Sequence, residues 1–415
     1  MYSGVGAPPG GLRAQRADAR CSRAHVRCAA LPRERAAAHY QLQTNMQTIK
    51  SFLYFYSFSL FNNNVYREIS SDEQWTALIA EIIDTCMEVS GAVACVVNNS
   101  SPEVIQLSYT KIITKPISLF TRNVTLDDGR QVTSQMVLLC AWRSVKEVSL
   151  LLGGICARLS VCGEGEGEGG SLSAGQLARV GEHFTGLLAE TKHRGAFEQA
   201  YVGFTLLLDR LWRCRSPRLH ELPRRWLAQL MRAIAADAGA LCATRRSAGV
   251  PYIIQALVTT ELQVQGNPLC FDACMRSLLE QCARGPAAAR GHALHGLRAL
   301  FRHGALAERA APHAARGLLA ALHAFDANSW AERNSSTLLL SALVQRVFGV
   351  QRATMTGRIF FLRYPEVYDF MLFYIRDPSV NTQYLLTYVL SLRYHGVFIL
   401  FIYLPKLILS LQALP

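Results

Sequence analysis

Apolar residues recur at helical spacing through most of this chain. From residue 133 to about residue 376 they repeat every three to four positions, and turn-forming residues separate the runs. This period is that of helices that bury one face. No stretch alternates apolar and polar residues with the period of a strand. The pattern predicts helices over 134–160, 174–190, 195–213, 223–238, 251–263, 269–283, 287–302, 309–324, 329–348 and 364–376.

Residues at several of these boundaries support the assignment. Ser173 and Gln176 have the spacing of a capping box. Pro223 and Pro268 stand where a first helical turn accepts proline, and Gly349 is placed as a C-cap. A further amphipathic helix is predicted over 72–90, and residues 96–132 are expected to form a loop.

The order of these helices predicts an all-α fold. Short turns join the helices, and one pair recurs about every 45–50 residues, the length of a HEAT or armadillo repeat. In such an array each hairpin buries its apolar faces against its neighbours. We therefore predict an α-solenoid of stacked helix hairpins. A compact all-α bundle is the competing interpretation, because the pairs share little sequence with one another.

Four parts of the chain differ in composition. Residues 1–71 are predicted to be a disordered basic tail followed by an aromatic segment. Residues 72–132 are predicted to be an isolated helix and a loop, 133–376 the helical-repeat domain, and 377–415 an atypical apolar tail. The apolar runs in the first and last parts are too short to cross a bilayer, so we expect no membrane association.

The charge balance suggests an acidic partner. The 415 residues carry a net charge of +13, and 37 of the 43 basic residues are Arg. Guanidinium groups suit phosphate and carboxylate and stack on bases, which favours RNA or an acidic protein. A GC-rich gene would produce the same excess of Arg, as the Ala- and Arg-rich stretch 283–325 illustrates. None of the twelve cysteines is spaced like a zinc ribbon or redox pair. Reduced thiols, and hence a cytoplasmic protein, are expected.

The sequence holds no recognisable catalytic arrangement. Gly165 to Gly170 match G-x-G-x-x-G, but they follow a helix, and the interleaved glutamates would repel a phosphate. His292 and His295 lie one helical turn apart without a third metal ligand, and we expect them at the surface or an interface. We predict no catalytic residue, no cofactor, no metal and no small-molecule substrate.

The stretch 244–251 is the most distinctive polar segment of the chain. It holds Arg245, Arg246, Ser247, Gly249 and Pro251 just before an apolar run. A cationic, hydroxyl-bearing turn at a helix N-terminus favours anions such as phosphate. The alternative is a solvated turn with two surface arginines.

Two further polar clusters fall at predicted helix junctions. One contains Lys192, His193 and Arg194, and the other contains Arg333 and Asn334. Polar residues at corresponding junctions can line one ridge of a solenoid. A basic corner between Arg210 and Trp226 fits either RNA stacking on its two indoles or a solvated corner with Trp212 and Trp226 in the core.

Five segments in order resemble those of the thyroid adenoma-associated protein (THADA) family. They are Cys140-Ala-Trp-Arg-Ser-Val-Lys-Glu-Val-Ser-Leu-Leu-Leu-Gly153, Glu190-Thr-Lys-His-Arg-Gly-Ala-Phe-Glu198, Thr244-Arg-Arg-Ser-Ala-Gly-Val-Pro251, Trp330-Ala-Glu-Arg-Asn-Ser-Ser-Thr337 and Met355-Thr-Gly-Arg358. The similarity covers about 74–98 and 133–374. Members of the family are far longer, and they usually have Leu or Ile where Val250 stands.

The resemblance implies a function as well as a helical-repeat fold. The resemblance implies that this chain is a non-catalytic regulatory scaffold for an FtsJ-like methyltransferase, which methylates a ribose 2′-oxygen in the tRNA anticodon loop. The expected partners are that enzyme and the anticodon stem-loop. An armadillo-type protein scaffold without RNA contact is the alternative. The resemblance makes the 244–251 signature the expected contact surface, extended by Lys192, His193, Arg194, Arg333 and Asn334.

Overall fold

The computed structural model describes residues 73–98, 124–125, 131–132, 134–162, 170–236, 241, 249–348 and 357–376. These residues are almost entirely helical, as the periodicity predicts. The chain forms two compact units. The described part of the first comprises the two-residue strands β1 (Val124–Thr125) and β2 (Gln131–Val132), which pair antiparallel, and the start of α6. The strands lie in the segment predicted as a loop, and a two-residue ladder is too short to leave an alternating pattern.

The second unit holds the remaining described helices. In chain order they are α4 (Glu73–Val97), α6 (Ser134–Arg158, from Ala141 on), α7 (Ala174–Glu190), α8 (Arg194–Arg213), α9 (Pro217–Ala235), α10 (Val250–Gln265), α11 (Leu269–Arg284), α12 (Ala287–Arg302), η2 (Gly304–Leu306), α13 (Ala307–Ala310), η3 (Ala311–His313), α14 (Ala314–Ala324), α15 (Trp330–Phe348), α16 (Gly357–Arg363) and α17 (Pro365–Arg376).

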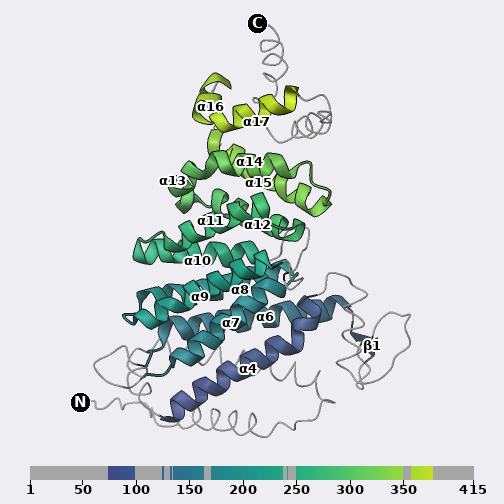
Figure 1. Ribbon diagram of the computed structural model, residues 1–415. Coiled ribbons are helices and arrows are strands. Elements are labelled where there is room, and N and C mark those ends of the chain that lie inside the picture. The colour runs from purple at the N-terminus through teal and green to yellow at the C-terminus, as the bar shows by residue number, and fades with distance from the viewer. Residues whose placement is uncertain are drawn as a thin grey trace, which may run out of the picture. The chain divides into compact units, whose positions relative to one another are not determined.

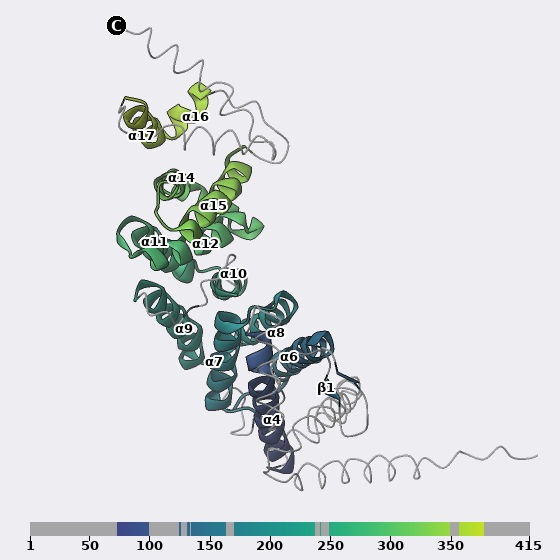
Figure 2. The same cartoon turned by 90° about the vertical axis from the view of Figure 1, so that its right-hand side faces the viewer.

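These helices form pairs that stack on one another, and each pair contributes one helix to each of two rows. In the first row α4 packs on α7, α7 on α9, α9 on α11, α11 on α14 and α14 on α17. In the second row α8 packs on α10, α10 on α12 and α12 on α15, and α6 lies beside α8 (Figures 1 and 2). Contacts run between neighbouring pairs, so the described helices form the predicted solenoid rather than a compact bundle.

The core lies between the two rows. Leu, Ile, Val and Phe side chains from each pair fill it, and the two indoles of the basic corner, Trp212 and Trp226, are buried with them. Helix α10 is enclosed on several sides, since α7, α8, α9, α11 and α12 all contact it. The corner therefore has the core-indole arrangement, and its rings offer no stacking surface to RNA.

Most predicted helix boundaries match within a few residues, but α9 begins earlier than predicted. Pro217 occupies its first turn, and Pro223 lies inside the helix rather than at its start. Ser173 and Gln176 do form a capping box at the start of α7. The predicted C-cap Gly349 and the glycines from Gly165 to Gly169 lie outside the described residues.

Candidate nucleic-acid and partner interface

The turns that lead from a first-row helix to its second-row partner lie along one edge of the helix stack. The described residues of these turns are 191–193, then 236, 241 and 249 in the α9–α10 connection, 285–286 and 325–329. Side-chain contacts join the starts of neighbouring second-row helices: Tyr252 of α10 meets Phe197 of α8, and Arg290 of α12 pairs with Glu332 of α15. We call this edge the junction ridge. The predicted site residues that the structure describes lie on this ridge or within the first five residues of a second-row helix.

The turn between α7 and α8 is fixed by its own polar groups. The backbone N–H groups of Lys192 and His193 both donate to the carbonyl of Val97, the last residue of α4, at 3.0 and 3.2 Å. His193 is the N-cap of α8, and its Nδ1 accepts from the N–H of Ala196. Partial burial lowers the pKa of His193, so the imidazole is held in the neutral form that a cap acceptor needs.

Arg194 begins α8 and projects into solvent. Its Nε donates to Glu198 Oε1 at 2.7 Å, one helical turn further on. That hydrogen bond, with the charge of Glu198 and the nearby Tyr252, raises the pKa of Arg194. The guanidinium therefore stays charged at the ridge and keeps its remaining N–H donors for another anion.

Gly249 forms the N-cap of α10 at a place where no side chain fits. A Cβ at this position would stand 2.2 Å from the carbonyl oxygen of Leu188, in the last turn of α7. Pro251 follows within the first turn of α10, as predicted, and is buried. The last residues of the 244–251 signature are thus packed against the helix that leads into the Lys192–Arg194 turn. Arg245, Arg246 and Ser247 lie outside the described residues.

Aromatic rings join these two segments. Tyr252 lies 5.2 Å from Phe197 and 5.3 Å from Tyr201, measured between ring centroids. Gln255 donates to the hydroxyl of Tyr201. The structure therefore brings Lys192, His193 and Arg194 together with the exit of the signature turn.

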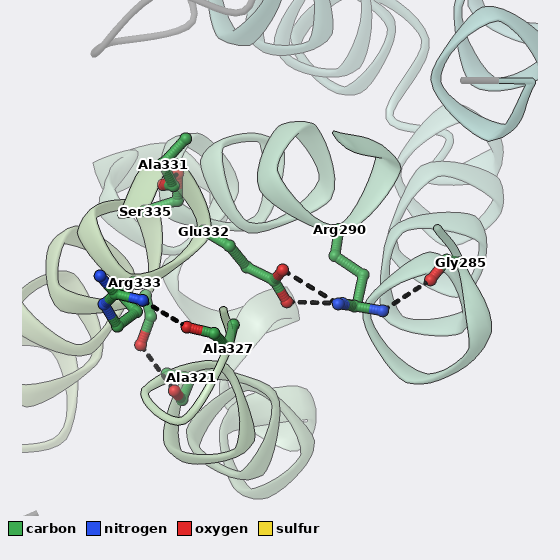
Figure 3. A network of polar contacts seen from close by, with 9 residues as sticks. Gly285, Arg290, Ala321, Ala327, Ala331, Glu332, Arg333 and Ser335 are labelled. Atoms are coloured by element: carbon green, nitrogen blue, oxygen red, sulfur yellow. Dashed lines mark hydrogen bonds and ion pairs between the residues drawn. The ribbon is translucent and has the colours of Figure 1, made fainter. Parts of the chain in front are cut away.

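Most polar side chains of the 330–337 segment bind partners inside the protein (Figure 3). Glu332 is 2% exposed and binds Arg290 with both oxygens, at 2.5 and 3.0 Å. Arg333 Nη1 donates to the carbonyls of Ala327 and Asn328 and so closes the α14–α15 turn. Arg333 and Asn334 lie on α15, three helices further along the second row from α8, with α10 and α12 between.

Serine and histidine complete this network. Ser335 Oγ lies 2.9 Å from His295 Nε2, and Ser336 donates to the carbonyl of Ala321. His292 and His295 are 7% and 3% exposed, so the expectation of surface histidines is wrong. The reason is that α12 packs between α10 and α15, which buries both flanks of the helix. Burial, then the charges of Arg298 and His292, lower the pKa of His295 to about 4.

Sequence reasoning missed three participants. Trp142 stacks on His193, Tyr252 packs beside Arg194's turn, and Glu332 holds Arg290. Trp142 and Glu332 both stand within family segments, which is the signal that could have pointed to them. Their roles still depend on contacts between residues 42 or more positions apart, as does that of Tyr252.

The described ranges lack two other kinds of feature. No three or more His, Cys, Asp or Glu side chains there gather closely enough to hold a metal ion. Among the same helices, none combines the length and the apolar character that a bilayer-spanning helix needs.

The two rows of helix pairs place the chain in the class of helical-repeat proteins. Sequence comparison is more specific, because the family model described as THADA/TRM732, DUF2428 matches residues 77–331. The chain belongs to this family. A second model, for the C-terminal TPR repeats of Trm732, matches residues 333–387.

Curated relatives carry the name of a methyltransferase regulator. The "tRNA (32-2'-O)-methyltransferase regulator THADA" of Drosophila melanogaster is 45% identical over 337 residues, which cover 73% of this chain and 19% of the relative. The Homo sapiens protein of that name is 44% identical over 257 residues, 58% of this chain and 13% of its own length. The Schizosaccharomyces pombe regulator trm732 is 24% identical over 331 residues, 73% and 20% of the two chains. The chain spans a fifth or less of each. No solved structure matches it.

Proposed function

We propose that this chain is a non-catalytic scaffold that helps a partner enzyme methylate the ribose 2′-oxygen at position 32 of tRNA. The names of its relatives support the reaction. The observation that carries the proposal is the meeting of two family segments on the junction ridge. The Lys192–Arg194 turn and the Gly249–Pro251 exit of the signature share the α7–α8 corner.

The ridge suits a positioning role. Backbone N–H groups at the starts of second-row helices favour anions, and Lys192, Arg194, Arg245 and Arg246 add positive charge to the same region of the chain. Holding a substrate in a reactive orientation accelerates a reaction even when the scaffold supplies no reacting group. The scaffold thus needs no cofactor of its own, because the methyl donor binds the enzyme.

The finer proposal names the partners. The enzyme is an FtsJ-like 2′-O-methyltransferase, and the RNA is the anticodon stem-loop. Arg245, Arg246 and Ser247 contact phosphate or the enzyme, while Gly249 and Pro251 fix the turn that carries them. Lys192, His193, Arg194, Arg333 and Asn334 extend the surface. We also propose a cytoplasmic location, for which the buried thiols Cys86, Cys156 and Cys274 are the supporting observation.

A co-purification and methylation assay tests this function. The full chain is expected to co-purify with an FtsJ-like methyltransferase and to support methylation of an anticodon stem-loop RNA. Replacing both Arg245 and Arg246 with Ala should abolish methylation while helicity by circular dichroism is unchanged. Arg218→Ala with Arg276→Ala is the matched control, because it removes two exposed guanidinium groups from first-row helices. Equal loss in both double variants would contradict the assignment.

A salt titration separates the alternative, an armadillo-type protein scaffold without RNA contact. Binding of tRNA through phosphates weakens steeply with added salt, because each phosphate contact releases counterions. A chain that binds the enzyme but shows no salt-dependent RNA binding would favour the protein scaffold.

A further inference from the structure

Trp142 and His193 form a stacked pair at the junction ridge. Their ring centroids lie 5.5 Å apart and their planes differ by 19°. Trp142 comes from α6 and His193 from the N-cap of α8, and both are half-buried. The indole therefore keeps part of its surface in contact with solvent at the mouth of the α7–α8 turn.

Gly195 allows the Trp142 indole to lie close to the first turn of α8. A Cβ at Gly195 would stand 3.2 Å from His193 Cε1 and 3.3 Å from Trp142 Cε3. Contacts that short are tighter than side chains normally adopt, so a larger residue would push the indole away from the first turn of α8. The flat stack depends on this glycine.

A second cluster of aromatic rings lies further along the second row. Phe197, Tyr201 and Tyr252 form the next cluster, on α8 and α10, with centroids 5.2–5.3 Å apart along the chain of contacts. Arg194 lies between the two groups, on the turn that starts with His193 and within electrostatic reach of Tyr252. Three neighbouring helices thus present aromatic rings at one end of the ridge.

The charges around the stack are mostly positive. Lys146 pairs with Glu147 at 3.6 Å, and Arg194 pairs with Glu198. Arg143 and Lys192 have no carboxylate partner within 4.0 Å among the side chains that the structure describes. Arg143 is exposed and directly follows Trp142, whereas Lys192 directly precedes His193. Cations beside an aromatic platform are the arrangement that binds single-stranded nucleic acid, with phosphates on the cations and bases on the rings.

We propose that the Trp142–His193 stack binds an unpaired nucleobase of the tRNA anticodon loop, while Arg143, Lys192 and Arg194 hold the flanking phosphates. This inference rests on the proposed function and adds a subsite to it. A base in a loop is already splayed from its neighbours, so it can stack on an indole at little cost. A paired base in the stem cannot, and the subsite therefore reads the loop.

Paired binding measurements test this subsite. The full chain, in complex with the methyltransferase, is titrated with an anticodon stem-loop RNA and with a blunt duplex of the stem sequence. Trp142→Ala should weaken binding of the stem-loop by about 5-fold to 150-fold, the cost of one lost base–aromatic stack. The affinity of Trp142→Ala for the duplex should stay within about twofold of that of the unmutated chain, because the phosphate contacts remain. Trp142→Phe, which keeps a ring, should recover most of the loss.

Two controls guard against loss of fold. Trp75→Ala removes another half-buried indole from α4, about 33 Å along that helix from Val97, and should leave both affinities unchanged. Intrinsic fluorescence of the unmutated chain gives an independent readout, because a stacked base quenches indole emission. The quenching by stem-loop RNA should disappear in Trp142→Phe only if Trp142 is the stacked residue.

The outcomes separate the subsite from the function. Unchanged stem-loop affinity in Trp142→Ala, with methylation intact, overturns the subsite and leaves the proposed function standing. Loss of enzyme binding in that variant with normal RNA affinity also overturns it and assigns Trp142 to the protein interface. Failure of the unmutated chain to bind the enzyme or support methylation contradicts the proposed function itself.

Discussion

The Cα of Gly249 stands against the carbonyl of Leu188, so closely that an added methyl group would lie 2.2 Å from the oxygen. This contact ties the exit of the signature turn to the last turn of α7. It explains why a glycine stands there although its φ of −91° suits any residue.

Gly249→Ala should therefore destabilise the fold. The added methyl must push α10 away from α7, at a cost of about 1–3 kcal/mol in the free energy of unfolding. Urea denaturation followed by circular dichroism measures it. Gly186→Ala is the matched control, because no atom lies within 4 Å of its added Cβ; within helix α7 it should stabilise by about 0.5–1 kcal/mol. Equal effects of the two substitutions would refute the packing argument.

Glu332→Gln should cost about 3 kcal/mol in the free energy of unfolding. This is the low end for a buried ion pair that loses one partner, because the Arg290 side chain is 34% exposed and partly reaches solvent. Thermal and urea unfolding give the measurement. Glu198→Gln removes the exposed partner of Arg194 and should leave the unfolding midpoint nearly unchanged. A similar loss in both variants would show that burial does not set the cost.

Two substitutions of Arg333 should distinguish its structural role in the α14–α15 turn from a role of its charge in RNA binding. Arg333→Ala loses the hydrogen bonds to Ala327 and Asn328 and should destabilise by about 1.5–3 kcal/mol. If Arg333 also contacts phosphate, the salt slope of tRNA binding should fall by about one. Arg333→Lys keeps the charge and should retain that slope while losing stability. A slope that is the same in all three proteins would remove Arg333 from the RNA surface.

Acidification should destabilise the fold through His295. Burial holds the pKa of this imidazole at about 4 in the folded chain, against about 6.5 in the unfolded chain. Between these values the unfolded chain binds a proton that the folded chain does not, so stability is complete above pH 6.5 and falls as the pH drops toward 4. His183, whose pKa burial and Arg179 also lower to about 4, titrates in the same range.

Unfolding free energies at several pH values between 7 and 4.5 check this expectation. Substituting His295 with Gln should reduce the pH dependence by up to about 3 kcal/mol over the whole range, the value of a 2.5-unit shift. A profile in the variant as steep as in the unmodified chain would show that other groups cause the loss.

The helices could be predicted from sequence because each buries a stripe of its own residues. Helix α12 matches its predicted range, since Pro286 and His303 bound an uninterrupted apolar pattern. Helix α9 does not, because Pro217 and Pro223 both satisfy the rule for a first turn and only packing decides between them. The predicted helix over 309–324 is broken into shorter pieces around Pro312, which stands in a 3-10 turn.

The site was predictable only in part, for a similar reason. The polar turns at Lys192–Arg194 and Gly249–Pro251 stand out in the sequence, and their common edge follows from the solenoid order. The contacts that give the surface its form do not. Glu332 meets Arg290 across 42 positions, and the flat stack of Trp142 on His193 depends on the missing side chain of Gly195.

The bonds that Lys192 and His193 make to Val97 bear on how the repeat region can be isolated. A fragment that starts at residue 133 would remove α4 and expose two amide protons in the turn that presents Arg194. Water would then replace the Val97 carbonyl as the acceptor of both N–H groups. The turn that holds the His193 imidazole would lose its backbone contact with α4. The shortest piece expected to retain the preformed α7–α8 corner therefore starts at or before Glu73.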